Sequence, residues 1–280
     1  MKPTLRLGAA FSGLLVAAAC APAASPAPAA DALVQPGLET PQSQPAPSAT
    51  AEFLPPPAGA NAFPFGDLGV SVSFSYPEGF ATGAVPAMLP KMAIQDPGDP
   101  EYPGHARILL TGYAGEDHTN TAPGIRVFRL IDVDAMEPAV VSGLQAVIAG
   151  TSEDHFDFPR IPAAGRTVDA QAQLVNFVNG KGYRFLVQGS YDAAALRGTR
   201  LYYIYQGITA NQKFLVTVLL ETDAPFIADL ATGAPFTSGP EADAYVKTLN
   251  ARINSAQPGE FSPSLDTFDQ LIQSLGVVED

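Results

Sequence analysis

The sequence predicts an α+β protein: a mainly antiparallel sheet packed by helices on one face. Two hairpin signals lie close together, at residues 179–180 and 210–212. Strand patterns outnumber helix patterns, and the last two patterns before the C-terminus are helical. Hairpins produce antiparallel strands, and helices that follow a run of strands tend to gather on one face of the sheet.

The first half of the folded part, residues 63–150, predicts strands followed by a helix. Val70, Val72 and Phe74 alternate with serines, which is the pattern of a half-buried strand. The region from 81 to 104 has no periodic pattern and is expected to be irregular. The predicted elements are strands at residues 70–76, 106–113 and 124–133 and a helix at residues 136–149.

The second half, residues 167–257, repeats this order, which suggests a duplication without any repeat at the residue level. Asn179-Gly180 is a strong signal for a two-residue hairpin turn. Two helices follow, one opened by a capping box of Ser238 with Glu241 and one starting at Ser262. The predicted strands are residues 167–178, 182–190, 199–209 and 213–221.

The N-terminus carries a targeting pattern. Lys2 and Arg6 precede an apolar run at residues 7–19, and the single cysteine, Cys20, follows. The run is too short to cross a bilayer, which needs about 20 apolar residues, and it matches the apolar core of a secretory signal.

This order resembles the signal of bacterial lipoproteins. The resemblance implies that residues 1–19 are removed and that Cys20 is acylated, which would tie the protein to a membrane of the cell envelope. Ala21 follows the cysteine in place of the aspartate that retains such proteins, so the outer membrane is favoured over the outer face of the cytoplasmic membrane where both exist. The alternative is ordinary cleavage at Ala19-Cys20-Ala21, which would release a secreted protein.

Residues 20–62 are expected to be a disordered linker between this anchor and a globular domain at residues 63–280. Ten prolines fall within residues 21–60 and charged residues are few. Such a composition buries too little apolar surface to offset the entropy of ordering. Proline at this density favours an extended spacer.

Charge excludes one class of partner. The chain has a net charge of −13, and no Lys/Arg cluster interrupts it. An acidic surface repels nucleic acid and anionic lipid. We therefore expect no nucleic-acid partner, and we expect membrane attachment only through the lipid on Cys20.

A second resemblance concerns the start of the folded part. The stretch Tyr76-Pro77-Glu78-Gly79-Phe80 is similar to the turn that ends the opening strand in small α+β domains of the PsbP/Mog1 type. Those domains are mostly non-catalytic assembly or binding modules, so the resemblance implies a module without enzyme activity. Residues 182–220 also resemble bacterial envelope proteins to which no activity is assigned.

Two Glu-Asp-His triplets are the candidate metal or acid–base residues, through Asp117 with His118 and Asp154 with His155. Carboxylates beside imidazole can bind a divalent metal, but only if the two loops meet in space. HExxH spacing is absent. The alternative is that both triplets lie in solvent-exposed loops and form no site. We expect no cofactor.

Three tyrosines are the candidate ligand-binding residues: Tyr202, Tyr203 and Tyr205. Tyrosines on an open sheet face can bind a glycan, an apolar ligand or a protein partner. They can equally be packing residues under helices. The leading hypothesis is a lipid-anchored, non-enzymatic binding or assembly module with an envelope protein or glycan as partner. The alternatives are a metal-dependent enzyme or envelope hydrolase that uses the Glu/Asp/His loops, and a carrier of a lipid or other apolar ligand.

Overall fold

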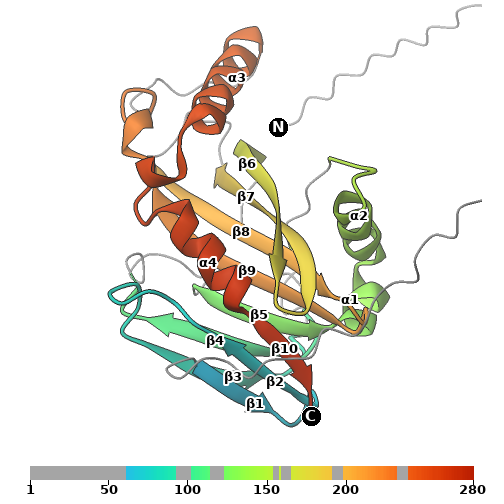
Figure 1. The fold of residues 1–280 in the computed structure, drawn as a ribbon. Helices are drawn as coiled ribbons and strands as arrows, with labels where there is room; N and C mark the ends of the chain where they lie inside the picture. The colour runs from blue at the N-terminus through green and yellow to red at the C-terminus, as the bar shows by residue number, and fades with distance from the viewer. Residues whose placement is uncertain are drawn as a thin grey trace, which may run out of the picture. The chain divides into compact units, whose positions relative to one another are not determined.

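The computed structural model describes residues 61–92, 102–113, 123–153, 158, 165–190, 198–231 and 239–280. In these ranges the chain forms two antiparallel sheets and four α-helices, which confirms the α+β class (Figure 1). Contacts divide the chain into residues 1–49 and residues 50–280, and every described residue belongs to the second unit. The expected signal, Cys20 and nearly all of the expected linker lie outside the described residues.

The larger sheet has seven strands, and two meanders build it. The first meander supplies three strands and the second supplies four, and they join side by side through β5 and β9. In spatial order the strands are β3 (Gly83–Leu89), β4 (His105–Thr111), β5 (Gly124–Arg129), β9 (Phe214–Asp223), β8 (Arg200–Thr209), β7 (Gly180–Ser190) and β6 (Gly165–Phe177).

Strand β3 corrects the expectation that residues 81–104 are irregular. It lies at the edge of the sheet and pairs only with β4. Its residues are mostly half-exposed, and Pro86 stands in its middle. A proline is tolerated on an edge strand because its missing N–H is needed only for a second neighbour. Because no face of β3 is fully buried and a proline interrupts it, its sequence lacks the alternation of apolar and polar residues that predicts a strand.

The smaller sheet joins the two ends of the described chain. Its order is β1 (Asn61–Phe65), β2 (Val70–Phe74) and β10 (Gly276–Glu279). The expected strand at 70–76 is confirmed as β2. The sequence analysis missed β1 and β10, because each is short and pairs with β2 rather than standing as a pattern of its own. In β10, Val277 lies opposite Val72, about two hundred residues away along the chain.

The helices follow the expected order with two corrections. The expected strand at 124–133 ends at Arg129, and a short helix begins at once, because Leu130 and Val133 are both buried one turn apart. The final helix starts after Ser264 rather than at Ser262, whose backbone pairs with Asp223 of β9. The helices are α1 (Leu130–Met136), α2 (Pro138–Ile148), α3 (Pro240–Ser255) and α4 (Leu265–Ser274), with 3-10 turns at Pro225–Ile227 and Pro258–Glu260.

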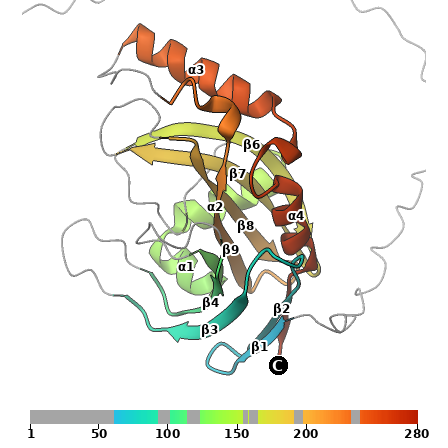
Figure 2. The same cartoon turned by 90° about the vertical axis from the view of Figure 1, so that its left-hand side faces the viewer.

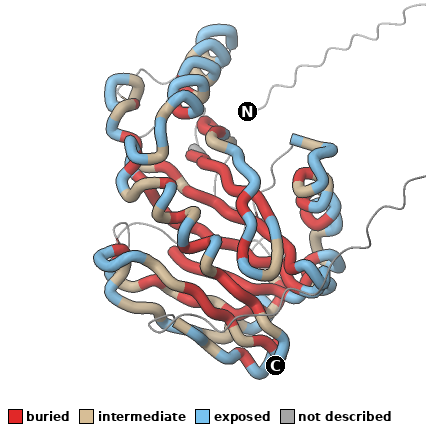
Figure 3. Tube along the Cα trace, in the orientation of Figure 1, coloured by how far each residue is buried: buried red, intermediate tan, exposed pale blue. Residues whose placement is uncertain are grey.

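Helices cover both faces of the large sheet, not one face as expected. In β9, Val216, Val218 and Leu220 belong to the apolar cluster that includes α3, α4 and the small sheet, whereas Leu215 and Leu219 belong to the cluster of α1 and α2. Figure 2 shows α4 and the α1–α2 pair on opposite sides of β8 and β9. The central strands are therefore buried on both sides (Figure 3).

Candidate functional site

The residues predicted to bind metal are not among those the structure describes. Asp117, His118, Asp154 and His155 all fall in the gaps, as does Cys20. Their roles stay predictions. Within the described ranges, no group of three or more His, Cys, Asp or Glu side chains is placed to hold a metal ion.

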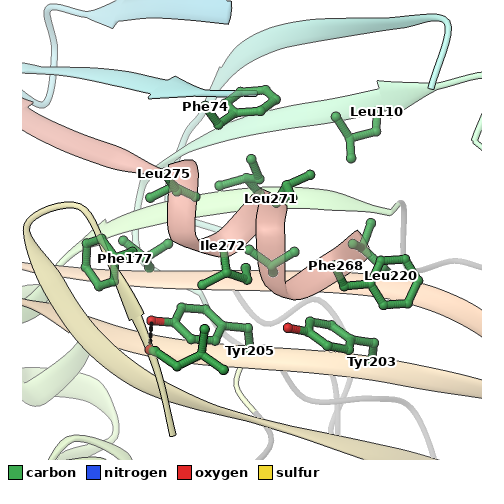
Figure 4. Close-up of a cluster of buried hydrophobic side chains, with 14 of the residues drawn as sticks. Phe74, Leu110, Phe177, Tyr203, Tyr205, Leu220, Phe268, Leu271, Ile272 and Leu275 are labelled. Carbon is green, nitrogen blue, oxygen red and sulfur yellow. Dashed lines mark hydrogen bonds between the residues drawn. The ribbon is translucent and has the colours of Figure 1, made fainter. Parts of the chain in front are cut away.

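Two of the three predicted tyrosines belong to the core. Tyr203 and Tyr205 of β8 are completely buried beneath α4 (Figure 4). The Tyr203 ring lies 4.8 Å from that of Phe268, and its hydroxyl donates to Asp269 Oδ1 at 2.8 Å. The Tyr205 hydroxyl donates to the Val175 carbonyl oxygen at 3.1 Å. Burial raises the pKa of both phenols well above its usual value.

These contacts match the packing alternative, because a ligand in solvent has no access to either ring in this structure. Tyr202 points to the other face of the sheet. It is partly buried against the α1–α2 cluster and lies opposite Glu221 of β9. The three tyrosines therefore do not form one surface.

An open groove of about 1000 Å³ lies where the turns at one end of the large sheet approach α2 and β10. This volume is at the upper end of the range for ligand pockets, about 300–1000 Å³. Its walls come from four segments far apart in the chain. Representative lining residues are Gln145 and Ile148 of α2, Val178 and Asn179 of the β6–β7 turn, Gln212 of the β8–β9 turn, and Glu279 of β10.

The β6–β7 turn is a rigid wall of this groove. The sequence placed Asn179-Gly180 at the centre of the turn, but Gly180 already pairs with Phe177 as the first residue of β7. A Cβ at position 180 would collide with the Phe177 ring, so glycine is needed there. The Asn179 amide donates to the Val277 carbonyl oxygen and accepts from the Val277 N–H at 3.1 Å. This pair of bonds ties the turn to β10.

The β8–β9 turn is held from within and from β10. The Thr209 hydroxyl donates to Asn211 Oδ1 at 2.7 Å, and Asn211 Nδ2 donates to Glu279 Oε1 at 2.6 Å. Lys213 forms an ion pair with Glu279 at 2.5 Å. Gln212 at the tip has φ of 59°, in the left-handed region that few non-glycine residues adopt. Gln145 Nε2 of α2 donates a hydrogen bond to Gln212 Oε1 at 3.2 Å.

Two smaller hollows extend the groove past this turn. Their volumes are about 390 and 330 Å³, both are lined in part by Gln212 and Ile131, and the second also by Gln145. An exposed apolar side chain lies at each end of this groove with its two hollows: Val178, which is 48% exposed, and Ile131, which is 74% exposed. We call this continuous area the turn-end surface. It offers carboxamides in the middle and apolar contacts at each end.

Sequence reasoning missed the turn-end surface because segments far apart in the chain build it: the four that line the groove, and α1, which contributes Ile131. The only local signal was the pair of predicted hairpin turns, at 179–180 and 210–212. Strands joined by hairpins in one meander place alternate turns at the same end of the sheet. That argument brings the two turns together, but it says nothing of α2 or β10.

No known protein family, curated protein or solved structure matches the chain. In the part of the chain that the structure describes, no helix combines the length and apolar character needed to cross a bilayer.

Proposed function

We propose that this protein is a lipid-anchored, non-enzymatic binding module of the cell envelope and that its turn-end surface holds an extended segment of a partner protein. Cys20, the lone cysteine after the apolar run, supports the anchor. The observation that carries the binding role is the open groove of about 1000 Å³.

The chemistry of the surface favours a protein segment over a glycan. Side-chain amides such as Gln145 and Gln212 both donate and accept, as a peptide backbone requires. Val178 and Ile131 offer apolar anchor points at the two ends. Sugars bind best on exposed aromatic rings, and the two rings that line these hollows, Phe177 and Phe214, are buried.

Photo-crosslinking in the producing cell tests the binding role. A photoreactive amino acid at Gln212 should yield a discrete crosslink to one envelope protein, identified by mass spectrometry. The same amino acid at Lys247, exposed on α3, serves as the control and should not yield it. Val178→Asp and Ile131→Asp should each reduce the crosslink by about tenfold, because each places a charge at an apolar contact. Crosslinks to glycan, or equal crosslinking from both positions, would contradict the proposal.

Mass spectrometry of the purified protein tests the anchor separately. The N-terminal peptide should begin at Cys20 and carry the mass of a diacylglyceryl group. A chain that begins elsewhere, or an unmodified Cys20, would support secretion instead. A lipid co-purified in the groove would favour the carrier hypothesis.

A further inference from the structure

A row of polar side chains crosses the large sheet on the face that α1 and α2 cover. Strand register places Arg107 of β4 opposite Arg126 of β5, and Arg126 opposite Thr217 of β9. Thr217 in turn lies opposite Gln206 of β8, and Gln206 opposite Tyr183 of β7. Five adjacent strands thus each contribute one residue to the row, and none of the five is acidic.

One half of this row has its hydrogen bonds satisfied. Gln206 Nε2 donates to the Phe158 carbonyl oxygen at 3.1 Å, and the Tyr183 hydroxyl lies 3.4 Å from Gln206 Oε1. Both side chains are buried. This half therefore behaves as an ordinary buried polar pair, which is stable because its partners are present.

The other half presents hydrogen-bonding atoms that are buried without a bond. Among the residues that the structure describes, neither Arg107 Nε nor Thr217 Oγ1 has a hydrogen-bond partner. The Thr217 residue is only 1% exposed. Arg107 and Thr217 lie on the two strands next to Arg126 and opposite it, and Arg126 is 8% exposed. Buried polar atoms without a bond cost free energy and are rare unless a water or ion satisfies them.

The charges of the two arginines also favour a bound anion. Like charges directly opposite each other on neighbouring strands destabilise a sheet, yet Arg107 and Arg126 occupy such positions. Burial, followed by the repulsion from Arg107, lowers the pKa of Arg126 to about 10, so it stays charged at neutral pH.

A group of aromatic rings lies on the same face of the sheet, beginning two residues along β4 and β5 from the two arginines. His105 stacks on Phe128 with ring centroids 4.5 Å apart, and Phe158 packs against Phe128 at 5.1 Å. Burial, opposed by a bond to the Pro103 carbonyl oxygen, lowers the pKa of His105 to about 4, so this ring is neutral at pH 7. Apolar surroundings strengthen the attraction between a guanidinium and an anion, because they lower the local dielectric constant.

We propose that Arg107, Arg126 and Thr217 bind a small oxyanion, the carboxylate or phosphate group of a ligand. Guanidinium N–H groups bind two oxygens of such a group at once, and the Thr217 hydroxyl donates a further bond. The bound oxyanion places negative charge between two like charges and supplies acceptors for Arg107 Nε and Thr217 Oγ1. This site is separate from the turn-end surface and does not depend on the function proposed for it.

Titration of the full mature chain with sodium phosphate and, separately, sodium acetate tests the site. Sodium chloride keeps the ionic strength constant, and the readouts are the midpoint of thermal unfolding and the calorimetric Kd. At least one oxyanion should raise the midpoint in a saturable way, and the anion that binds more tightly identifies the preferred group. Arg107→Gln and Thr217→Val should each weaken binding by about tenfold, because each removes a bond to a charged acceptor.

Arg129→Gln is the matched control, because Arg129 is exposed at the end of the same strand as Arg126 and its loss changes the net charge equally. It should leave the Kd unchanged. Arg107→Lys is a second variant that keeps the positive charge, so that a loss of binding is not attributed to misfolding. It should still lose affinity, since lysine lacks the planar guanidinium that binds two oxygens at once. The proposal is overturned if neither anion changes the midpoint, or if the shift is the same in Arg107→Gln, Arg107→Lys and Thr217→Val as in the unmodified chain.

Discussion

The two faces of the large sheet each bury a cluster of charged and polar side chains, and they differ in whether the described cluster contains a carboxylate. We call the cluster under α4 the closed cluster, because Asp269 lies in it beside Arg184. Under α4, Arg184 forms an ion pair with Asp269 at 3.4 Å, and its Nη2 donates to Gln173 Oε1 at 2.8 Å. Tyr203 donates to the same carboxylate, and Arg184 Nη1 donates to the Gln171 carbonyl oxygen. Within the described residues, Arg184 Nε makes this ion pair without a hydrogen bond. On the α1–α2 face of the same described part, Arg107 Nε and Thr217 Oγ1 are also buried without a hydrogen bond, and the row of five residues there contains no carboxylate.

The closed cluster explains how α3 and α4 are fixed to the sheet. Gln171 lies in a bulge of β6 with φ of 56°. Its Nε2 donates to the carbonyl oxygens of Ile253 and Ala256, at 2.8 and 3.0 Å, where α3 ends. Carbonyl groups at a helix end have no partner within the helix, so these bonds satisfy them. A network that contains its own carboxylate fixes the structure, whereas the row on the other face leaves donors that the acceptor atoms of a ligand could bind.

The largest expected effect comes from opening the closed cluster. Arg184→Met leaves Asp269 half-buried without its cation, and we expect the free energy of unfolding to fall by about 3–5 kcal/mol. Urea unfolding followed by circular dichroism measures this loss. The double variant Arg184→Met/Asp269→Leu should lose less, because it removes both charges. A loss below about 1 kcal/mol for the single variant would show that the ion pair is not what fixes α4.

The second largest effect is expected from lowering the pH, which should change the stability contributed by the two faces in opposite directions. The folded-state pKa of His105, about 4, lies below the ordinary value of 6.5, so the unfolded chain binds more protons between these pH values. Its contribution to stability is complete above pH 6.5 and falls as the pH drops to 4, by about 3 kcal/mol at most. Burial raises the pKa of Asp269, so protonation of that carboxyl favours the folded state and acts in the opposite direction.

Urea unfolding between pH 7 and pH 4 measures this acid effect. His105→Phe retains a ring to stack on Phe128 and should lose less stability than the unmodified chain as the pH falls. If the free energy of unfolding falls equally with pH in both proteins, protonation of His105 does not destabilise the folded state.

The smallest effect is the removal of one hydroxyl from each face. Tyr203→Phe deletes a bond to the Asp269 carboxylate and should cost about 1–2 kcal/mol. Thr217→Val deletes a buried hydroxyl that makes no bond in the described structure, so in buffer without oxyanions it should be neutral or stabilising by up to about 1 kcal/mol. Thermal unfolding in chloride buffer measures both. Similar losses from the two variants would show that the two clusters are equally closed.

Local patterns predicted most of the secondary structure. The alternation from Val70 to Phe74 and the helical pattern near the C-terminus are both local, and the structure confirms them as β2 and α4. Burial on both faces also had a signal, because residues 214–220 are apolar at nearly every position. A continuous apolar run is typical of a strand covered on both sides. The expectation of helices on one face overlooked it.

The candidate sites were much harder to predict. Arg107 and Arg184 are both arginines within strands that are largely apolar, and the sequence does not distinguish them. Asp269, which neutralises Arg184, lies on a helix 85 positions later in the chain. Glu279, which bonds to both Asn211 and Lys213, lies in a strand that the sequence analysis did not detect.

By itself, the sequence determined the fold class, every strand of the two meanders except β3, and the acidic charge, because periodicity and composition act between near neighbours. Only the tertiary structure decided which helices cover which face, that β10 closes the turn-end surface, and that Asp269 pairs with Arg184. These outcomes depend on pairing and packing between segments tens to hundreds of residues apart, where no local pattern selects the partner.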